Sequence, residues 1–389
     1  MGQDLAKTPY AKRIERLPLY IFADLERKVA AKRKAGVDII SLGIGDPDLP
    51  PPQFIVDAVK DHLTDPACHG YPTSRGEKRI REAVARWMEG RFGVEVDPES
   101  EVCVTVGSKE GLSNLSRAYV NPGEKVAACN PGYPVYRQSA SLLNDAENVM
   151  LPLTKENGFL PNLDMVKGCR MFFFGYPNNP TGAIAPNMFW KSVGMMADMR
   201  PETVVVSDHA YCEMTYDDYR SPSVLQHTRN AVEFHSMSKV FNMTGYRVGF
   251  AVGRRDYIAG LEKVKSNLDS GTPMWIQEAM AEGLGRYRGA DPPKEVRENL
   301  AVYKRRRDLM VAGLQKLGLK VEPPKGTFYL WVDVGGDEGA FCERALDAGV
   351  VLTPGRGFGE HGAGFVRVAL TQPDERLREC LERLARVVS

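Results

Sequence analysis

The sequence has no long apolar run, no excess of charge of one sign and no cluster of cysteines. The longest apolar runs, such as residues 171–175, have the length of a strand, well below the ~18 apolar residues of a membrane-spanning helix. The 51 basic and 50 acidic side chains leave a formal net charge of +1, which gives no general attraction to nucleic acid or to an anionic membrane. Residues 1–16 are polar and charged and lack the apolar core of a secretory signal.

The seven cysteines are scattered along the chain, at Cys68, Cys103, Cys129, Cys169, Cys212, Cys342 and Cys380. Their number is odd and they form no CxxC pair, so the sequence predicts neither a disulfide framework nor a metal site. Most lie inside apolar runs, where a buried thiol packs like a small apolar side chain. We therefore expect a protein of the reducing cytoplasm.

At 389 residues the chain is too long for one hydrophobic core, because single cores stop growing near ~250–300 residues. Short β-branched runs alternate with helical patterns, such as residues 108–119 and 136–143, through the middle of the chain. This alternation is typical of a mostly parallel sheet with helices on both faces. Strands are expected at residues 101–106, 125–129, 148–151, 171–174, 203–207, 232–234 and 247–252.

The pattern changes from about residue 292. Long helices are expected at residues 293–317 and 374–388, with strands at 327–334, 350–352 and 365–370 between them, which indicates a smaller α+β domain. Residues 1–45 are too few for a domain of their own and are expected to pack onto the smaller one. We predict a large domain of residues 46–288 and a small domain of residues 1–45 and 289–389.

Lys239 has an unusual set of sequence neighbours. Ser236 and Ser238 precede it, and Arg247 follows within the segment Thr-Gly-Tyr-Arg-Val-Gly. Hydroxyls and a guanidinium suit a dianionic phosphate, and a lysine beside such a site can form a Schiff base with an aldehyde cofactor. A strand-end lysine among ordinary surface hydroxyls is the alternative that this segment alone leaves open.

Polar residues also follow four other candidate strands. Asp208 ends the strand at residues 203–207 and Tyr211 comes three residues later; the acid can pair with a pyridine nitrogen at the ligand-binding edge of the sheet, or cap a helix. Gly107-Ser108-Lys109 joins a strand to a helix, whose first N–H groups attract an anion. Turn chemistry alone explains the segments 130–134 and 176–182, although Tyr133 in the first offers an aromatic face.

Taken in order, the NNPTG turn, the strand that ends in Asp208, the SxSK segment and the GxRxG segment resemble the class I/II aminotransferases, which are pyridoxal-phosphate enzymes of fold type I. The resemblance runs from Gly43-Ile-Gly-Asp-Pro to Arg367. It implies an α/β fold with a large domain, whose mostly parallel seven-stranded sheet is flanked by helices, and a smaller α+β domain. It also implies a homodimer with shared active sites that acts on an amino acid and a 2-oxo acid.

The resemblance implies roles for the matching residues. Lys239, Asp208 and Tyr211 correspond to the lysine bonded to pyridoxal 5'-phosphate, the partner of its pyridine nitrogen and the donor to its ring oxygen. Further cofactor-binding residues would be Ser108, Lys109, Tyr133, Asn179, Ser236, Ser238, Arg247 and, from the neighbouring subunit, Tyr71. Substrate-binding residues would be Tyr20, Gly45, Lys109, Tyr133, Asn179 and Arg367. The guanidinium of Arg367 would bind the α-carboxylate through two hydrogen bonds.

Residues 17–28 and 242–253 resemble, more narrowly, the LL-diaminopimelate aminotransferases, which make LL-diaminopimelate from tetrahydrodipicolinate and glutamate on the route to lysine. Transamination of aspartate, alanine or an aromatic amino acid, or a pyridoxal-phosphate-dependent β-elimination, is the alternative. Tyr20 is alternatively an aromatic plug between the domains. Arg75 stands where many relatives carry Glu, and it is expected to meet a distal carboxylate or to cap a helix.

Three segments imitate other sites. Residues 357–362 spell GxGxxG, but no βαβ unit surrounds them, so we expect a loop rather than a dinucleotide site. His209 lies beside Asp208 as in a Ser/His/Asp arrangement, but the sequence has no GxSxG segment to supply the serine. We therefore expect His209 in the wall of the pocket. The basic run at residues 304–307 is expected to be the solvated face of a helix. Too few residues precede Gly43 for the DNA-binding domain of a gene regulator built on this fold.

Overall fold

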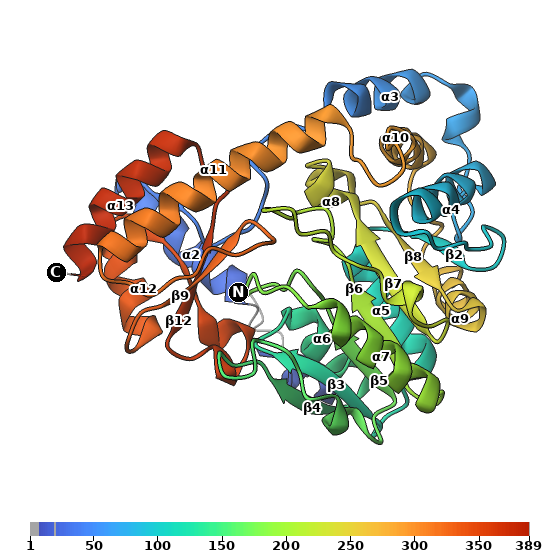
Figure 1. Cartoon of the computed structure of the whole chain (residues 1–389), viewed down its shortest axis with the longest axis horizontal. Helices are drawn as coiled ribbons and strands as arrows, with labels where there is room; N and C mark the ends of the chain where they lie inside the picture. The colour runs from blue at the N-terminus through green and yellow to red at the C-terminus, as the bar shows by residue number, and fades with distance from the viewer. Residues whose placement is uncertain (1–7, 19–20, 389) are drawn as a thin grey trace, which may run out of the picture.

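The computed structural model describes residues 8–18 and 21–388. A large sheet covered by helices forms one side of the molecule, and two small sheets with several helices form the other (Figure 1). The long helix α11 (Lys294–Lys316) extends between the two sides. Within the described residues, no helix combines the length and the apolar content that crossing a membrane requires.

The large sheet has seven strands in the order β2-β8-β7-β6-β5-β3-β4. Their bounds are β2 Val102–Thr105, β3 Lys125–Asn130, β4 Glu147–Pro152, β5 Met171–Phe174, β6 Val204–Asp208, β7 Ala231–Ser236 and β8 Gly249–Gly253. Neighbouring strands run parallel, except that β8 is antiparallel to both β2 and β7. The predicted mostly parallel sheet of seven strands is therefore confirmed.

Helices cover both faces of this sheet, because its central strands carry buried apolar side chains on both faces. In β5, Phe172 and Phe174 join one hydrophobic cluster, whereas Met171 and Phe173 join another, as the alternation of side chains along a strand requires. The first cluster includes residues of α3 (Gln53–Leu63), α4 (Lys78–Phe92), α7 (Asn187–Met199) and α10 (Met274–Gly285). The second includes residues of α5 (Ser108–Tyr119), α6 (Pro134–Gln138) and α9 (Arg255–Lys265).

The smaller side of the molecule has its own apolar cluster. An antiparallel sheet, β11-β12-β9, lies there with the parallel pair β1-β10. The bounds are β1 Ile40–Ser41, β9 Tyr329–Asp333, β10 Val350–Val351, β11 Thr353–Pro354 and β12 Phe365–Ala369, with helices α1 Lys12–Glu15, α2 Ile21–Lys34, α12 Glu338–Asp347 and α13 Asp374–Val388. Ile40 and Leu42 pack into this cluster, and so do Tyr211, Met214 and Tyr216 from beyond β6. The division at residues 46–288 stays a prediction.

The basic run on α11 differs from its prediction. Lys304 and Arg305 are solvated, but Arg306 and Arg307 are buried, with 4% and 3% of their surface exposed. Arg307 pairs with Asp217, a residue of the segment between β6 and β7. The solvated-face interpretation was therefore wrong for half of the run, because α11 packs against neighbours on the side that these two arginines share.

Arg306 ties α11 to the segment after β1. Its Nη1 and Nη2 atoms donate to the two carboxylate oxygens of Asp48, at 2.7 and 2.8 Å. Removal of one partner of a buried ion pair leaves the other without compensation. We expect Arg306→Ala to lower the free energy of unfolding by about 2–4 kcal/mol, as measured by denaturant titration.

Arg305→Ala is the matched control. Arg305 is the preceding residue and pairs with Asp374 at the surface, with 59% of its side chain exposed, where ion pairs contribute little. The unfolding midpoint of the Arg305→Ala variant should stay near that of the unchanged protein. Equal losses for the two variants would show that the buried pair with Asp48 does not stabilise the fold.

Candidate active site

A cavity of about 380 Å³ opens at the carboxyl edge of the large sheet, where β9 and β12 of the smaller side face it. Twelve of the fourteen predicted site residues line this cavity: Gly45, Ser108, Lys109, Tyr133, Asn179, Asp208, Tyr211, Ser236, Ser238, Lys239, Arg247 and Arg367. They come from segments far apart in the chain. The volume lies within the ~300–1,000 Å³ of small-molecule sites.

Lys239 projects into the cavity from the short helix α8 (Met237–Val240), which follows β7. Its Nζ donates to the carbonyl oxygen of Gly45 at 2.9 Å and lies 5.4 Å from the centre of the Phe328 ring. Burial lowers the pKa of this amine to about 8; the charge of Asp46 opposes the change and that of Arg367 adds to it. The amine is therefore far more often neutral near pH 7 than that of an ordinary lysine.

Asp208 occupies the last position of β6. Its Oδ2 accepts a hydrogen bond from the Tyr136 hydroxyl at 2.9 Å, and its Oδ1 accepts one from the N–H of Ala210 at 3.2 Å. Burial raises the pKa of this carboxyl to about 6, and the two hydrogen bonds oppose that shift. The geometry holds an acid where a cationic ring nitrogen would stabilise its charged form.

Tyr136 was missed in the sequence, where it served only as the start of an expected helix at residues 136–143. That helix is shorter than expected: α6 ends at Gln138, and a separate 3-10 turn covers residues 142–144. The Tyr136 ring stacks on Phe173 of β5, with centroids 5.3 Å apart and planes at 5°. This stacking fixes the hydroxyl beside Asp208. The one signal in the sequence for Tyr136 was its position three residues after Tyr133, a predicted site residue.

Arg367 lies in the opposite wall, on β12, with 1% of its surface exposed. Its Nη1 donates to the Asn179 side-chain oxygen at 2.9 Å, and its Nη2 donates to the carbonyl of Gly43 at 2.7 Å. The guanidinium carbon lies 4.1 Å from the ring centre of Tyr329 and 4.6 Å from that of Phe358. These contacts hold a planar fork of donors, the geometry that suits a carboxylate.

Tyr329 connects several site residues, although the sequence did not single it out. Its hydroxyl lies 3.0 Å from that of Tyr211, and its ring lies under Arg367. A Cβ at Gly45 would lie 1.8 Å from the Tyr329 hydroxyl oxygen. Glycine at position 45 therefore leaves room for the side chain of Tyr329. That side chain contacts Tyr211 from the large sheet and Arg367 from β12. Burial raises the pKa of Tyr211 well above its ordinary value, and Tyr329 adds to this.

The end of the cavity beside α5 is rich in hydrogen-bond donors. Gly107, with φ +73°, precedes Ser108 at the start of α5, and a Cβ on this glycine would lie 2.6 Å from Nη2 of Arg247. Ser236 and Ser238 line the same cavity, and the Ser236 hydroxyl accepts from the Ser238 N–H at 3.3 Å. Two hydroxyls, a guanidinium and a helix N-terminus form a donor set for an anion.

Lys109 adds a second cationic side chain to this end of the cavity. Burial lowers the pKa of its amine, and the positive charge of Arg247 lowers it further.

Two predicted residues lie elsewhere, and a third falls outside the described residues. Tyr71 is 91% exposed and does not line the cavity, and Tyr20 lies outside the described residues. Arg75 pairs with Glu262 and donates to the Glu99 carbonyl, so it neither reaches the cavity nor caps a helix. His209 also departs from its prediction: it is buried behind Asp208, outside the cavity lining.

Comparison with known proteins identifies the family. The model of the family "Aminotransferase class I and II" matches residues 37–384. A curated LL-diaminopimelate aminotransferase of Moorella thermoacetica is 45% identical over 389 aligned residues, which cover 97% of this chain and 98% of that protein. This chain is a class I and II aminotransferase. Other curated relatives that are 42–44% identical to this aminotransferase carry the same enzyme name.

Solved structures agree with the assignment to fold type I. The apo form of BacF from Bacillus subtilis superposes on this aminotransferase with a TM-score of 0.92 at 33% identity, covering 98% of this chain and 99% of that one. The aspartate aminotransferase of Thermus thermophilus, solved with maleate, has a TM-score of 0.90 at 30% identity, with 98% and 100% covered. The fold that the motifs implied is therefore confirmed.

The lowered pKa of Lys239 predicts a pH profile for this aminotransferase. A pKa of about 8, against an ordinary 10.5, makes the neutral amine roughly 300-fold more abundant at pH 7. In the ligand-free protein, methylation of Lys239 by formaldehyde and cyanoborohydride should accelerate up to about pH 8 and then level off. Peptide mass spectrometry at a series of pH values measures the rate.

Lys60 is the internal comparison, because 69% of its side chain is exposed on α3. Both lysines are followed in the same digests, so reagent concentration and temperature cancel. Identical pH profiles for Lys239 and Lys60 would contradict the lowered pKa.

Proposed function

We propose that this aminotransferase is an LL-diaminopimelate aminotransferase, which exchanges the amino group between LL-diaminopimelate and 2-oxoglutarate through bound pyridoxal 5'-phosphate. The products are glutamate and tetrahydrodipicolinate, which forms when the new oxo group condenses with the remaining amine and releases water, and the pathway is lysine biosynthesis. The observation that carries the proposal is that one cavity holds the amine of Lys239, the acid of Asp208 and the buried fork of Arg367. Near full-length similarity to enzymes of that name supports the substrate.

The residues around the cavity fit this cofactor. The donors at the α5 end, Ser108, Ser236, Ser238 and Arg247, would hold the phosphate. Asp208 would pair with the pyridine nitrogen, with its orientation kept by Tyr136. Tyr211 and Asn179 would bind the ring oxygen, and Tyr133 would lie against the ring. When bound, pyridoxal phosphate supplies an electron sink that makes the Cα–H of an amino acid acidic.

Lys239 is suited to move the proton of that Cα. Its Nζ accepts a proton readily only when neutral, and a pKa of about 8 keeps a useful fraction neutral at physiological pH. The carbonyl of Gly45 holds Nζ at 2.9 Å, which limits the positions that the amine takes. The fully buried ring of Phe328 borders the amine on another side.

Arg367 orients the substrate through its α-carboxylate. The hydrogen bonds to Asn179 and Gly43 fix the guanidinium plane before any ligand arrives, so little ordering remains to be done on binding. Diaminopimelate also carries a second ammonium and a second carboxylate. Glu26 and Lys109 line the cavity as well, and we propose that these two side chains bind the distal charged groups.

The proposed enzyme is a cytoplasmic homodimer. All seven cysteines are free within the described part of the chain, and six of them are buried, which suits a reducing compartment. Tyr71 exposes 91% of its surface, an unusual fraction for an aromatic side chain. We propose that it enters the cavity of the partner subunit and contacts the cofactor phosphate there.

The substrate is tested with a panel of amino donors. Enzyme, 2-oxoglutarate and LL-diaminopimelate should yield glutamate with a kcat/KM at least about 10-fold above that for aspartate, alanine or phenylalanine. A preference for one of those three donors would contradict the proposed substrate but would leave transamination as the reaction. Release of pyruvate and ammonia from a cysteine-type substrate, without glutamate formation from any donor, would contradict transamination itself.

Arg367→Lys should lower kcat/KM for every amino acid donor by about 100-fold, because a lysine keeps the charge but loses the fork of two hydrogen bonds. Steady-state glutamate formation measures the effect. Arg356→Lys is the control, since Arg356 lies in the preceding loop with 66% of its side chain exposed. Loss of less than twofold at Arg367 would contradict its role in carboxylate binding.

A further inference from the structure

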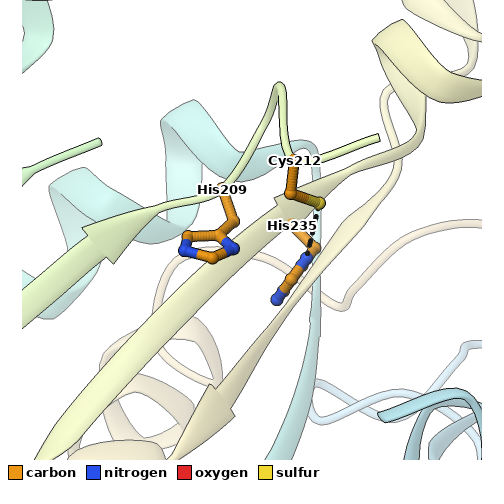
Figure 2. Close-up of side chains that lie close together, drawn as sticks. All are labelled: His209, Cys212 and His235. Carbon is orange, nitrogen blue, oxygen red and sulfur yellow. Dashed lines mark hydrogen bonds between the residues drawn. The ribbon is translucent and has the colours of Figure 1, made fainter. Parts of the chain in front are cut away.

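Three potential metal ligands meet directly behind Asp208. Figure 2 shows His209, Cys212 and His235 together at the ends of β6 and β7. Each is buried, with 1%, 4% and 1% of its surface exposed. One ligand atom from each lies within 4.8 Å of the other two. None of the three lines the proposed active-site cavity.

The spacing of these atoms suits tetrahedral coordination. The Cys212 Sγ lies 3.7 Å from the His235 Nδ1. A tetrahedral ion about 2.3 Å from a sulfur and about 2.0–2.1 Å from a nitrogen separates those two ligands by about 3.6 Å. The three side chains also line a void of about 10 Å³, roughly the volume that one water-sized sphere needs. Space for one small ion is already present.

His209 points to a ligand on its own account. Both of its ring nitrogens are buried and lack a hydrogen-bond partner within the described residues. Its Nε2 lies 3.5 Å from Oε1 of Glu233, at the far limit of hydrogen bonding. A buried polar atom without a partner is costly, and a bound ion is one of the few explanations for it.

Glu233 supports the two imidazoles from behind. Its Oε2 lies 3.3 Å from the His235 Nε2, so a proton on Nε2 leaves the Nδ1 lone pair facing Cys212. A carboxylate that orients a histidine in this way is the usual outer partner of a metal-binding imidazole. Glu233 itself is fully buried, and its contacts within the described residues include His209, His235 and the N–H of Val224, but no lysine or arginine.

We propose that His209, Cys212 and His235 bind one divalent transition-metal ion, with Glu233 as the orienting carboxylate. One thiolate and two imidazoles favour zinc among the common metals. A water molecule would complete the coordination, which requires the void to widen, because its volume of about 10 Å³ suits one small sphere. With Cys212 as a thiolate and Glu233 as a carboxylate, the ion brings the net charge of the buried cluster to zero. This inference does not depend on the proposed substrate or cofactor.

The electrostatics of the two free histidines agree with this. Burial lowers the pKa of His209 to about 4 and that of His235 to about 3. Both rings are therefore neutral at physiological pH, the form in which a ring nitrogen binds a metal. Burial also raises the pKa of the Cys212 thiol well above its ordinary value, so a bound ion would have to displace the thiol proton, as coordination does.

The site would be structural rather than catalytic. His209 adjoins Asp208, Cys212 adjoins Tyr211, and His235 adjoins Ser236, so the ion would link the ends of two neighbouring strands under three residues of the active-site cavity. The sequence predicted no metal site because His235 is distant in the chain. The pair His209 and Cys212, three residues apart, was the available signal.

Metal content of the purified full-length enzyme tests the proposal. After growth in zinc-supplemented medium and exhaustive dialysis, mass spectrometry of the digested protein should find about one zinc per chain. Cys212→Ser should lower this at least tenfold. Cys68→Ser is the matched control, because Cys68 belongs to the second and more exposed group of candidate ligands, with His62 and Asp65, and it should leave the zinc content unchanged.

Two results would overturn the proposal. One is less than about a tenth of a zinc per chain in the unchanged protein; the other is zinc that survives Cys212→Ser but is lost in Cys68→Ser. X-ray absorption on the Cys68→Ser variant keeps the test decisive if Cys212→Ser does not fold, because the second group of candidate ligands then has no sulfur. A zinc shell with one sulfur at about 2.3 Å and nitrogens at about 2.0–2.1 Å supports the site, whereas a shell of oxygen and nitrogen alone contradicts it.

Discussion

The active site depends on keeping ionisable groups inside a cavity whose walls are largely buried. Burial acts on the two central groups in opposite directions, lowering the pKa of Lys239 to about 8 and raising that of Asp208 to about 6. Each group is then held by neutral partners, the carbonyl of Gly45 for the amine and the Tyr136 hydroxyl for the acid. Both therefore remain poised for a charged ligand group, which is the condition that cofactor chemistry requires.

The two sides of the molecule divide this task. The carboxyl edge of the large sheet supplies the acid, the lysine and the anion-binding donors, whereas β9 and β12 supply Tyr329 and Arg367. Arg367 crosses the boundary through its bond to Asn179. Tyr211, whose backbone follows β6, reaches back to Tyr329. A substrate bound in the cavity would thus contact both sides, and changes in their packing would reach the site directly.

Much of this arrangement was predictable from the sequence. Buried strands such as β5, and helices with a well-marked face such as α5 and α13, appear in the structure with their predicted bounds, because their apolar pattern is local. The polar residues after the strands were predictable as a group, since the carboxyl ends of parallel strands meet at one edge. The antiparallel direction of β8 was not predictable, because a fully buried strand has the same composition in either direction.

The residues that the sequence missed act through distant partners. Tyr136 matters because β5 and β6 bring Phe173 and Asp208 beside it, and Tyr329 matters because β9 places its hydroxyl against Gly45. The buried state of Arg306 and Arg307 likewise depends on Asp48 and Asp217. A one-dimensional pattern records the polarity of such residues but not their neighbours. His209 and His235 show the same limit, because only the pairing of β6 with β7 joins them.

The central claim is that Lys239 is the residue that carries the cofactor. Enzyme with bound pyridoxal phosphate is reduced with borohydride, digested and mapped by mass spectrometry, and its absorbance near the visible edge is recorded beforehand. The account predicts a pyridoxyl group on the peptide that contains Lys239, and loss of the absorbance band in Lys239→Ala. A label on Lys109, the other lysine of the cavity wall, or an unchanged band in Lys239→Ala would contradict it.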